Sequence, residues 1–282
     1  MIRIITDSAA DFEPGELQQK NIICIPLTVV FGETEYREGE NLSKVRFYEL
    51  LSQMDSLPKT AQASPQCLLE LFEDAVRAGD EAIYISLSSA LSGTYQSAVM
   101  ALQMVESDKC FVVDSRNATG GQKLLVEYAV RLREEGLSAV QIVAELEQLR
   151  ERITVYAKID SLENLYHGGR ISQTVYTVGT LANIKPIIQV DNQGRVTVPA
   201  KAMGTRKAMD HVCKLVKQNP PDPQFPVYVL YTDDPEQGKV LEERLQVTGS
   251  VACATGTVQV GAAIGTHVGC RVAGIAYVRA EQ

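Results

Sequence analysis

A run of hydroxyl-bearing side chains between Leu87 and Ser97 is the part of the sequence best suited to binding chemistry. The residues are Leu87-Ser88-Ser89-Ala90-Leu91-Ser92-Gly93-Thr94-Tyr95-Gln96-Ser97, between an apolar segment and a helical pattern. Such a strand-to-helix turn presents free backbone N–H groups and the positive end of a helix dipole, and its hydroxyls add further donors. We therefore predict a site for a carboxylate or a phosphate, with simple helix capping as the competing interpretation.

The charge around this turn favours a carboxylate over a phosphate. Phosphate sites usually recruit lysine or arginine, and the segment 82–104 contains neither. A carboxylate that leaves water needs only enough donors to offset its desolvation and to fix its orientation. Within the turn, we expect Ser88, Ser89 and Gly93 to support the site.

Two further residues could reach the same anion. Thr60 lies just ahead of a helix that Ser64 is expected to cap, so the Thr60 hydroxyl has no assigned role, which favours ligand contact. His267 stands between Gly265 and Gly269, and these small neighbours would allow a ligand to approach closely. A hydrogen-bonded structural histidine fits the same pattern equally well.

A serine hydrolase acting on acyl esters is the alternative interpretation. Ser92 would be the nucleophile and His267 the base, with Asp7 or Asp114 as the third member, because such groups can be gathered from distant positions. The sequence has no G-x-S-x-G elbow, and it lacks the glycine-rich nucleotide motifs and the H-E-x-x-H metal motif. We expect no catalytic residues, no metal and no cofactor.

The composition is typical of a soluble protein of two ordinary domains. The chain has 282 residues, 45% of them hydrophobic, and no uninterrupted apolar run long enough to span a membrane. Charge follows Met1 too closely for a signal peptide, so we expect a cytoplasmic protein without membrane insertion. A net charge of −8 argues against nucleic acid as a partner. The six cysteines stand far apart, which argues against a zinc site or a disulfide scaffold.

Alternating apolar segments and helical patterns in the first half predict a mostly parallel α/β sheet with flanking helices. The predicted strands are Ile2–Ile5, Ile22–Leu27, Ala82–Leu87 and Phe111–Val113, and the predicted helices are 65–79, 94–106 and, as two segments, 124–150. Three strands end in small polar residues, at Thr6-Asp7-Ser8, Ser88-Ser89 and Asp114-Ser115. Ligands bind at the carboxyl ends of parallel strands, so we expect these turns to share one crevice.

The pattern changes near residue 152, which predicts one α/β domain at 1–152 and another at 153–282. In the second part, Ile187–Val190 and Val196–Pro199 bracket Asp191-Asn192-Gln193-Gly194, as in an antiparallel hairpin. The other predicted elements are strands at Thr154–Ile159 and Val227–Tyr231 and helices at Arg206–Lys217 and Glu236–Leu245. No linker rich in Pro, Gly or Ser separates the two parts, so we expect them to pack closely.

Several segments, taken in order, resemble the DegV family of fatty-acid-binding proteins. They are Ile4-x-Thr6-Asp7-Ser8, Lys59-Thr60-x-Gln62-x-Ser64-Pro65, the run 88–97, Val113-Asp114-Ser115, Leu162-Glu163-x-Leu165, Gly168-Gly169-Arg170-Ile171-Ser172, Asn183-Ile184-Lys185-Pro186-Ile187 and His267-Val268-Gly269. The resemblance covers nearly the whole chain. It implies two DegV-like α/β domains, the second with a mixed sheet, that hold one long-chain fatty acid such as palmitate between them.

The resemblance also implies a role and a set of contacts. The protein would be a monomeric carrier in lipid transport or fatty acid metabolism that presents its ligand to an ATP-dependent fatty acid kinase. Thr60 and Ser92 match the family's carboxylate contacts, with His267 close to the same group and Arg170 in the Gly-Gly-Arg segment. About 15 methylenes at about 0.8 kcal/mol each contribute at most about 12 kcal/mol on burial, so the tail can dominate affinity.

Basic residues of the second half match positions where family members could meet the kinase; they are Lys201, Arg206 and Lys207. The sequence also departs from the family's usual residues at three positions: Ala61, Ala63 and Cys270. The first two replace a serine and a proline, which predicts a segment around Thr60 that is looser or shaped for a different chain, and Cys270 stands where a proline is common.

Overall fold

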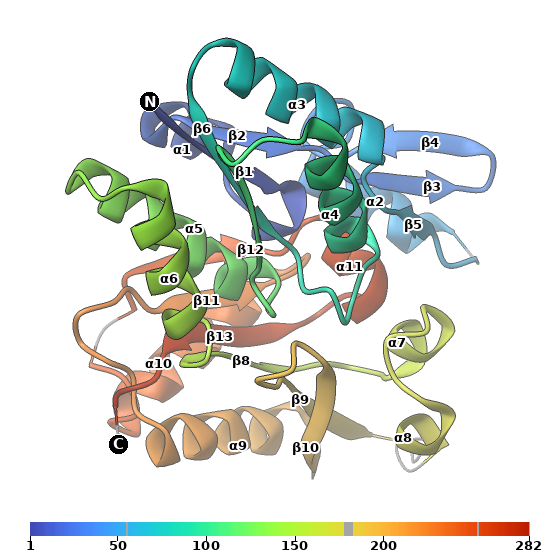
Figure 1. The fold of residues 1–282 in the computed structure, drawn as a ribbon. Helices are drawn as coiled ribbons and strands as arrows, with labels where there is room; N and C mark the ends of the chain where they lie inside the picture. The colour runs from blue at the N-terminus through green and yellow to red at the C-terminus, as the bar shows by residue number, and fades with distance from the viewer. Residues whose placement is uncertain (55, 178–182, 253, 282) are drawn as a thin grey trace.

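The computed structural model describes residues 1–54, 56–177, 183–252 and 254–281. In these ranges the strands form a four-stranded, a six-stranded and a three-stranded sheet, and no sheet joins strands from before and after residue 152. Figure 1 shows the two larger sheets in different halves of the molecule, each with its own helices. The boundary at residue 152 stays a prediction, because helices of each half also pack against the other half.

The four-stranded sheet is parallel, as predicted. Its strands, in spatial order, are β2 (Ile22–Ile25), β1 (Ile2–Asp7), β6 (Glu81–Ser86) and β7 (Cys110–Asp114). Successive side chains of a strand point to opposite faces, so Ile4 and Ile5 are buried in two different apolar clusters. Both faces of this sheet are therefore covered, which explains why its strands are apolar throughout.

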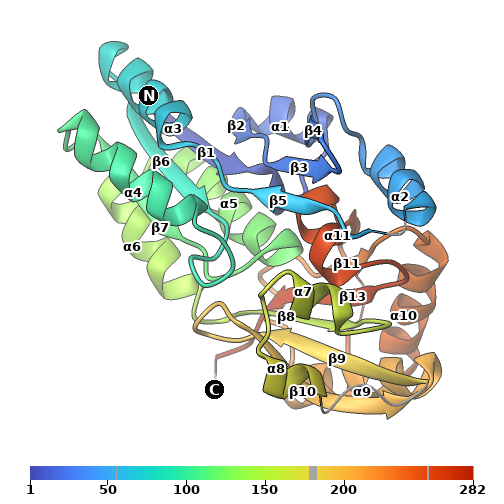
Figure 2. The same ribbon diagram turned by 90° about the vertical axis from the view of Figure 1, so that its right-hand side faces the viewer.

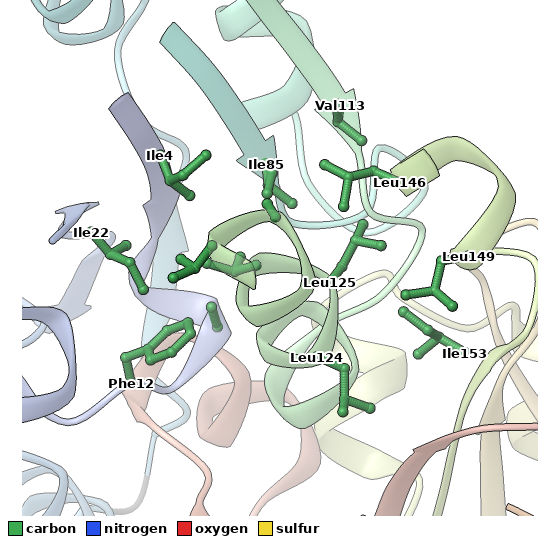
Figure 3. Packing of buried hydrophobic residues seen from close by; sticks show 14 of the residues in the cluster. Ile4, Phe12, Ile22, Ile85, Val113, Leu124, Leu125, Leu146, Leu149 and Ile153 are labelled. Carbon is green, nitrogen blue, oxygen red and sulfur yellow. The ribbon is translucent and has the colours of Figure 1, made fainter. Parts of the chain in front are cut away.

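Two pairs of helices cover these faces. They are α3 (Pro65–Arg77) with α4 (Thr94–Val105), and α5 (Thr119–Glu134) with α6 (Ala139–Leu149). The sequence predicts each of them with its ends shifted by a few residues. Figure 3 shows the face covered by α5 and α6, where Leu125 and Leu146 pack with Ile4 and Val113 in one cluster.

Helix α5 begins five residues earlier than the predicted Leu124, because its first turn is buried against the second sheet. A Cβ atom at Gly120 would lie 2.8 Å from Cδ2 of Leu230 and 2.9 Å from Cβ of Ala276. Glycine thus lets the α5 backbone approach the strands of the other half. The cluster around α5 is continuous from Ile4 to Ala276, so the two larger sheets share one apolar core.

The second sheet is mixed, in agreement with the DegV-like expectation. Its strands, in spatial order, are β10 (Val196–Met203), β9 (Ile184–Val190), β8 (Ile153–Lys158), β13 (Ala273–Val278), β11 (Tyr228–Tyr231) and β12 (Gly256–Gln259). The predicted hairpin is confirmed as the antiparallel pair β9 and β10, and only β11 and β12 run parallel within this sheet. Helices α9 (Thr205–Gln218) and α10 (Pro235–Val247) pack against it.

A small antiparallel sheet near the start of the chain was not predicted. It consists of β4 (Thr34–Arg37), β3 (Thr28–Phe31) and β5 (Lys59–Ala61). Strand β5 is three residues long and polar, so it carries no apolar alternation that a sequence pattern could detect. Thr60 pairs with Val29 in this sheet, and the predicted cap of the next helix is confirmed, because Ser64 Oγ accepts a hydrogen bond from the Cys67 N–H.

The remaining elements are short. They are the 3-10 helix η1 (Ser8–Ala10) and helices α1 (Pro14–Lys20), α2 (Lys44–Gln53), α7 (Glu163–His167), α8 (Gln173–Thr177) and α11 (Ala262–Val268). Figure 2 shows α11 between the small sheet and α7. This segment from the end of the chain therefore packs against the first half. Within the described ranges, no helix combines the length and the apolar composition needed to cross a membrane.

Candidate functional site

A cavity of about 190 Å³ lies between the two halves of the molecule. This volume is more than ten times the ~10–15 Å³ that one water molecule needs, so the cavity has room for an extended ligand. One wall comes from strands of the second sheet, with Val155, Ile188 and Leu230, and another from the first half, with Leu27 and Leu87. Most of the lining is aliphatic and suits an apolar chain.

Four of the polar side chains in this lining come from segments that are far apart in the sequence. Thr60 lies on β5, Ser92 in the turn before α4, Arg170 just after α7, and His267 in the last turn of α11. Thr60 Oγ1 and His267 Nε2 are 3.1 Å apart, although 207 residues separate them in the chain. The three residues predicted to meet a carboxylate thus line one cavity, together with Gly93 and Arg170.

The imidazole of His267 is held in its neutral form. Burial lowers its pKa to about 4, and the positive charge of Arg170 acts in the same direction. Its Nδ1 is buried without a hydrogen-bond partner in the described part of the chain. A Cβ atom at Gly168 would lie 2.3 Å from Nδ1, so the backbone at the end of α7 packs directly against the ring. This packing fixes the ring, with Nε2 directed at Thr60.

Arg170 brings a positive charge to the cavity that the Thr60 and Ser92 hydroxyls also line. Its Nε donates a hydrogen bond to the Leu91 carbonyl at 3.0 Å, and its Nη1 donates to the Gly168 carbonyl. No ion pair joins this guanidinium to a carboxylate among the described residues. A half-buried cation that lacks an acidic partner in the described ranges and lines the same cavity as two hydroxyls suits a bound anion.

Ser88 and Ser89, which were expected to support the ligand, do not line the cavity. The Ser88 hydroxyl donates to the Gly194 carbonyl at 2.8 Å, and the Ser89 hydroxyl donates to Oδ2 of Asp114 at 2.5 Å. These bonds tie the turn to neighbouring loops. The serines of this turn therefore have different roles: Ser92 lines the cavity, and the two earlier serines hold the turn in place.

The polar ends of the parallel strands were expected to share the ligand crevice, but none of them lines the cavity, because their polar groups bond to one another and to nearby protein groups. Asp7 is fully buried, and its Oδ2 accepts hydrogen bonds from the Tyr84 hydroxyl and the Leu87 N–H. Gln122 of α5 donates to Thr6 and to Asp7. These hydrogen bonds connect the end of β1 and helix α5 to Leu87, the first residue of the serine-rich turn.

The hydrogen bonds do not assemble the triad of the alternative hydrolase interpretation. Ser92 Oγ lies 3.0 Å from Oγ1 of Thr94, whereas His267 contacts Thr60. Asp7 and Asp114, the two candidate third members, bond to other groups and not to His267. A general base must lie within hydrogen-bond reach of its nucleophile, so the observed contacts favour a binding role for Ser92.

Sequence reasoning missed the contribution of Gln62 to the cavity lining. Its Nε2 donates to Ser97 Oγ at 3.1 Å, and a Cβ atom at Gly93 would lie 1.9 Å from its Oε1. Glycine at position 93 therefore makes room for the Gln62 amide. The available signal was the two-residue spacing from Thr60, which places both side chains on the same side of an extended segment.

A second cavity of about 610 Å³, with a more polar lining, adjoins the first. Both are lined by Thr60, Arg170 and His267, and the second adds Lys59 and Asn164. The polar end of the apolar cavity is therefore also the wall of a wider polar cleft. A ligand held by these shared residues would present its head group to this cleft.

The predicted partner-docking residues lie away from both cavity linings. Lys201 is half-buried on β10, and Arg206 and Lys207 are exposed in the first turn of α9. Five of the six cysteines have free thiols, and Cys253 lies outside the described residues. In the described ranges, no group of three or more His, Cys, Asp or Glu side chains is arranged to hold a metal ion.

Comparisons with known proteins agree over almost the whole chain. A family model described as "Uncharacterised protein, DegV family" matches residues 1–280. A DegV domain-containing protein of Caldanaerobacter subterraneus subsp. tengcongensis is 36% identical over 279 residues, which cover 97% of each chain.

Solved structures share the fold. A stearic acid-binding protein from Eubacterium ventriosum has a TM-score of 0.90 and 27% identity, covering 99% of this chain and 98% of its own. DegV from Bacillus subtilis, described as a fatty acid binding protein, has a TM-score of 0.85 and 31% identity, covering 99% of each chain.

We expect His267 to titrate near pH 4 instead of near its ordinary value of 6.5, because burial and Arg170 disfavour its charged form. NMR of protein labelled in the histidine ring would follow the titration, with His267→Gln to assign the signal. A folded-state pKa below the unfolded value means that this group's contribution to the free energy of unfolding is lost as pH falls from 6.5 toward 4. A midpoint near 6.5 would contradict the buried environment described above.

Proposed function

The chain belongs to the DegV family, as its sequence motifs predict, and we propose that it binds one long-chain fatty acid such as palmitate and presents it to a fatty acid kinase. The observation that carries this proposal is the apolar cavity that ends at Thr60, Ser92 and His267. The solved relatives from E. ventriosum and B. subtilis, described as binding stearic acid and fatty acid, support the same ligand class. The protein is a carrier, and its role lies in lipid transport or fatty acid metabolism.

The acyl chain occupies the aliphatic part of the cavity. Burial contributes up to about 0.8 kcal/mol per methylene, before the cost of ordering the chain. The side chains in contact with the tail come from both halves, including Val155 and Ile188 on one side and Leu27 on the other. The tail is therefore enclosed by the predicted domains 1–152 and 153–282 together.

The carboxylate accepts hydrogen bonds from the hydroxyls of Thr60 and Ser92. With the proton of the neutral His267 ring on Nε2, the ring donates to Thr60 Oγ1, and the Thr60 proton is then directed at the carboxylate. Arg170 balances the ligand's charge from the edge of the same cavity. Hydrogen bonds to an ionised group are stronger than neutral ones, so few donors offset the desolvation of one carboxylate.

The kinase reaches the carboxylate from the polar cleft. The sequence has no glycine-rich nucleotide motif, so the ATP is bound by the partner, and a carboxylate oxygen attacks its terminal phosphorus with ADP leaving. Lys201, Arg206 and Lys207 form the docking surface, because they are basic residues on a chain of net charge −8. The carrier acts in the cytoplasm as a monomer and meets the kinase transiently.

We expect protein purified from a bacterial host to carry about one fatty acid per chain, because the cavity encloses one extended tail. Denaturation, organic extraction and mass spectrometry of the extract would identify and count the lipid. An empty extract, combined with no uptake of added palmitate, would exclude the proposed ligand.

Removing either head-group hydroxyl should weaken fatty acid binding. We expect Thr60→Ala and Ser92→Ala each to raise the Kd for palmitate by about tenfold or more, because each loses a hydrogen bond to a charged group worth roughly 1.5–3 kcal/mol. Calorimetry would measure both constants, with Ser89→Ala as the control because its hydroxyl lies in the same turn but outside the cavity. An equal loss in all three variants would mean that the turn acts only as a helix cap.

Docking of the kinase can be tested separately from binding of the lipid. We expect the triple variant Lys201→Glu, Arg206→Glu, Lys207→Glu to keep native palmitate affinity but to lose most ATP-dependent phosphorylation of the bound lipid by a bacterial fatty acid kinase. The matched control is Lys214→Glu, which reverses an exposed charge on the same helix. Unchanged phosphorylation in the triple variant would place the docking surface elsewhere.

A further inference from the structure

Helix α11, which contributes His267 to the lipid cavity, is held at its start by two buried carboxyl groups. Oδ1 of Asp11 accepts a hydrogen bond from the Gly261 N–H at 2.9 Å, and Oε1 of Glu38 accepts one from the Ala262 N–H. Asp11 follows η1 and Glu38 follows β4, so both acids come from the first half of the chain. They attach a helix from the end of the chain to that half.

The two acids lie next to the lipid cavity. Ala263, Ile264 and His267 of α11 line this cavity, and so does Thr119, which lies beside the Asp11 carboxylate. The Asp11 Oδ2 atom is buried without a hydrogen-bond partner in the described part of the chain. A movement of α11 away from these acids would therefore open a wall of the cavity.

The charges that face the two acids do not balance them. Lys44 and Lys123 are the cations nearest to Asp11, but they also form ion pairs with Glu13 and Glu16 at 2.7 Å and 2.6 Å. The other titratable groups that face the acids are Cys24 and Tyr48, and burial raises the pKa of each of them, so both are neutral. The Ser8 hydroxyl donates to Oε2 of Glu38 at 2.6 Å.

Two ionised carboxylates would therefore repel each other in a buried site. Burial raises the pKa of Asp11 to about 6, and it raises that of Glu38 to about 7 with the Asp11 charge adding to the effect. Burial therefore favours a form of the pair that carries one proton. A separate cavity of about 360 Å³ lined by Glu38, Ser8 and Lys44 provides a route for the proton that does not cross the lipid cavity.

Helix α11 is short and lies between two glycines. It has seven residues between Gly261 and Gly269, and Gly269 has φ 76° and ψ −161°, a conformation that favours glycine. A Cβ atom at Gly265 would lie 2.6 Å from the Tyr48 hydroxyl, so the helix packs closely without a large side chain at this point. The hydrogen bonds from Asp11 and Glu38 therefore add to this packing in attaching α11 to the first half.

We propose that Asp11 and Glu38 form a proton-dependent clamp that keeps α11 closed over the bound lipid while they share a proton and loosens α11 when both are ionised. The proposal rests on the lipid-binding function proposed above and adds its regulation. The direction of the pH dependence follows from linkage, because the closed form binds the proton more tightly than an open, hydrated form. Closure of α11 is therefore favoured at low pH and weakened as pH rises through about 6 to 7.

The test is the rate at which a fluorescent fatty acid, cis-parinaric acid, leaves the protein for an excess of phosphatidylcholine vesicles. We expect this rate to rise about tenfold between pH 6 and pH 8, because a closed-form pKa of about 7 leaves about a tenfold linkage at pH 6 that is gone by pH 8. Glu38→Gln should abolish the dependence. The matched control is Glu40→Gln, an exposed neighbour whose variant should keep the native pH dependence.

Proton uptake gives a second measurement that does not depend on kinetics. Calorimetric titration with palmitate at pH 7, in buffers of different ionisation enthalpy, should show proton uptake on binding by the native protein and less by Glu38→Gln. The fatty acid ionises identically in every variant, so only the difference between variants is interpreted. Fatty acid binding with a release rate that is flat from pH 6 to pH 8, or equally steep in Glu38→Gln, would overturn the clamp, whereas absence of binding would overturn the proposed function.

Discussion

The packing of α11 against the first half of the chain is the interaction on which the rest of the site depends. This short helix reaches the small sheet and α2 from a position near the end of the sequence, and Gly265 permits the close contact with Tyr48. It thereby brings His267 to Thr60 across 207 residues. If α11 were displaced, the cavity would lose both an apolar wall and the contact that orients its polar end.

The polar end of the lipid cavity can accommodate an anion, and the described ranges contain no cluster of metal ligands. An anion in a dry cavity needs donors and positive charge, but a protonated histidine beside Arg170 would put two cations together. Burial keeps the His267 ring neutral and in contact with the Thr60 hydroxyl, and in the proposed complex Arg170 supplies the charge. The same principle, burial that shifts proton equilibria, operates at Asp11 and Glu38 at the other end of α11. One helix therefore links two sites whose protonation is set by desolvation.

Regular elements could be predicted well where a pattern extended over several turns or strands. The parallel sheet, its flanking helices and the β9–β10 hairpin follow from apolar periodicity and from turn residues such as Asp191 to Gly194. The small sheet could not be predicted in this way, because β5 has three residues and mostly exposed side chains. Because this strand was not predicted, Gln62 was missed as well. Its position on the same side as Thr60 follows only when the segment is known to be extended.

The sequence by itself determined the fold class, the family and the chemical types at the site, because motifs and periodicity are local properties of the chain. It also separated Ser92 from its neighbours as the expected contact, and the structure places Ser92 in the cavity lining and Ser88 and Ser89 outside it. Only the tertiary structure decided which distant groups meet, that His267 contacts Thr60 and not Ser92, and that Arg170 has no acidic partner among the described residues. Burial, and with it every shifted pKa, depends on contacts between remote segments, and no local pattern encodes those contacts.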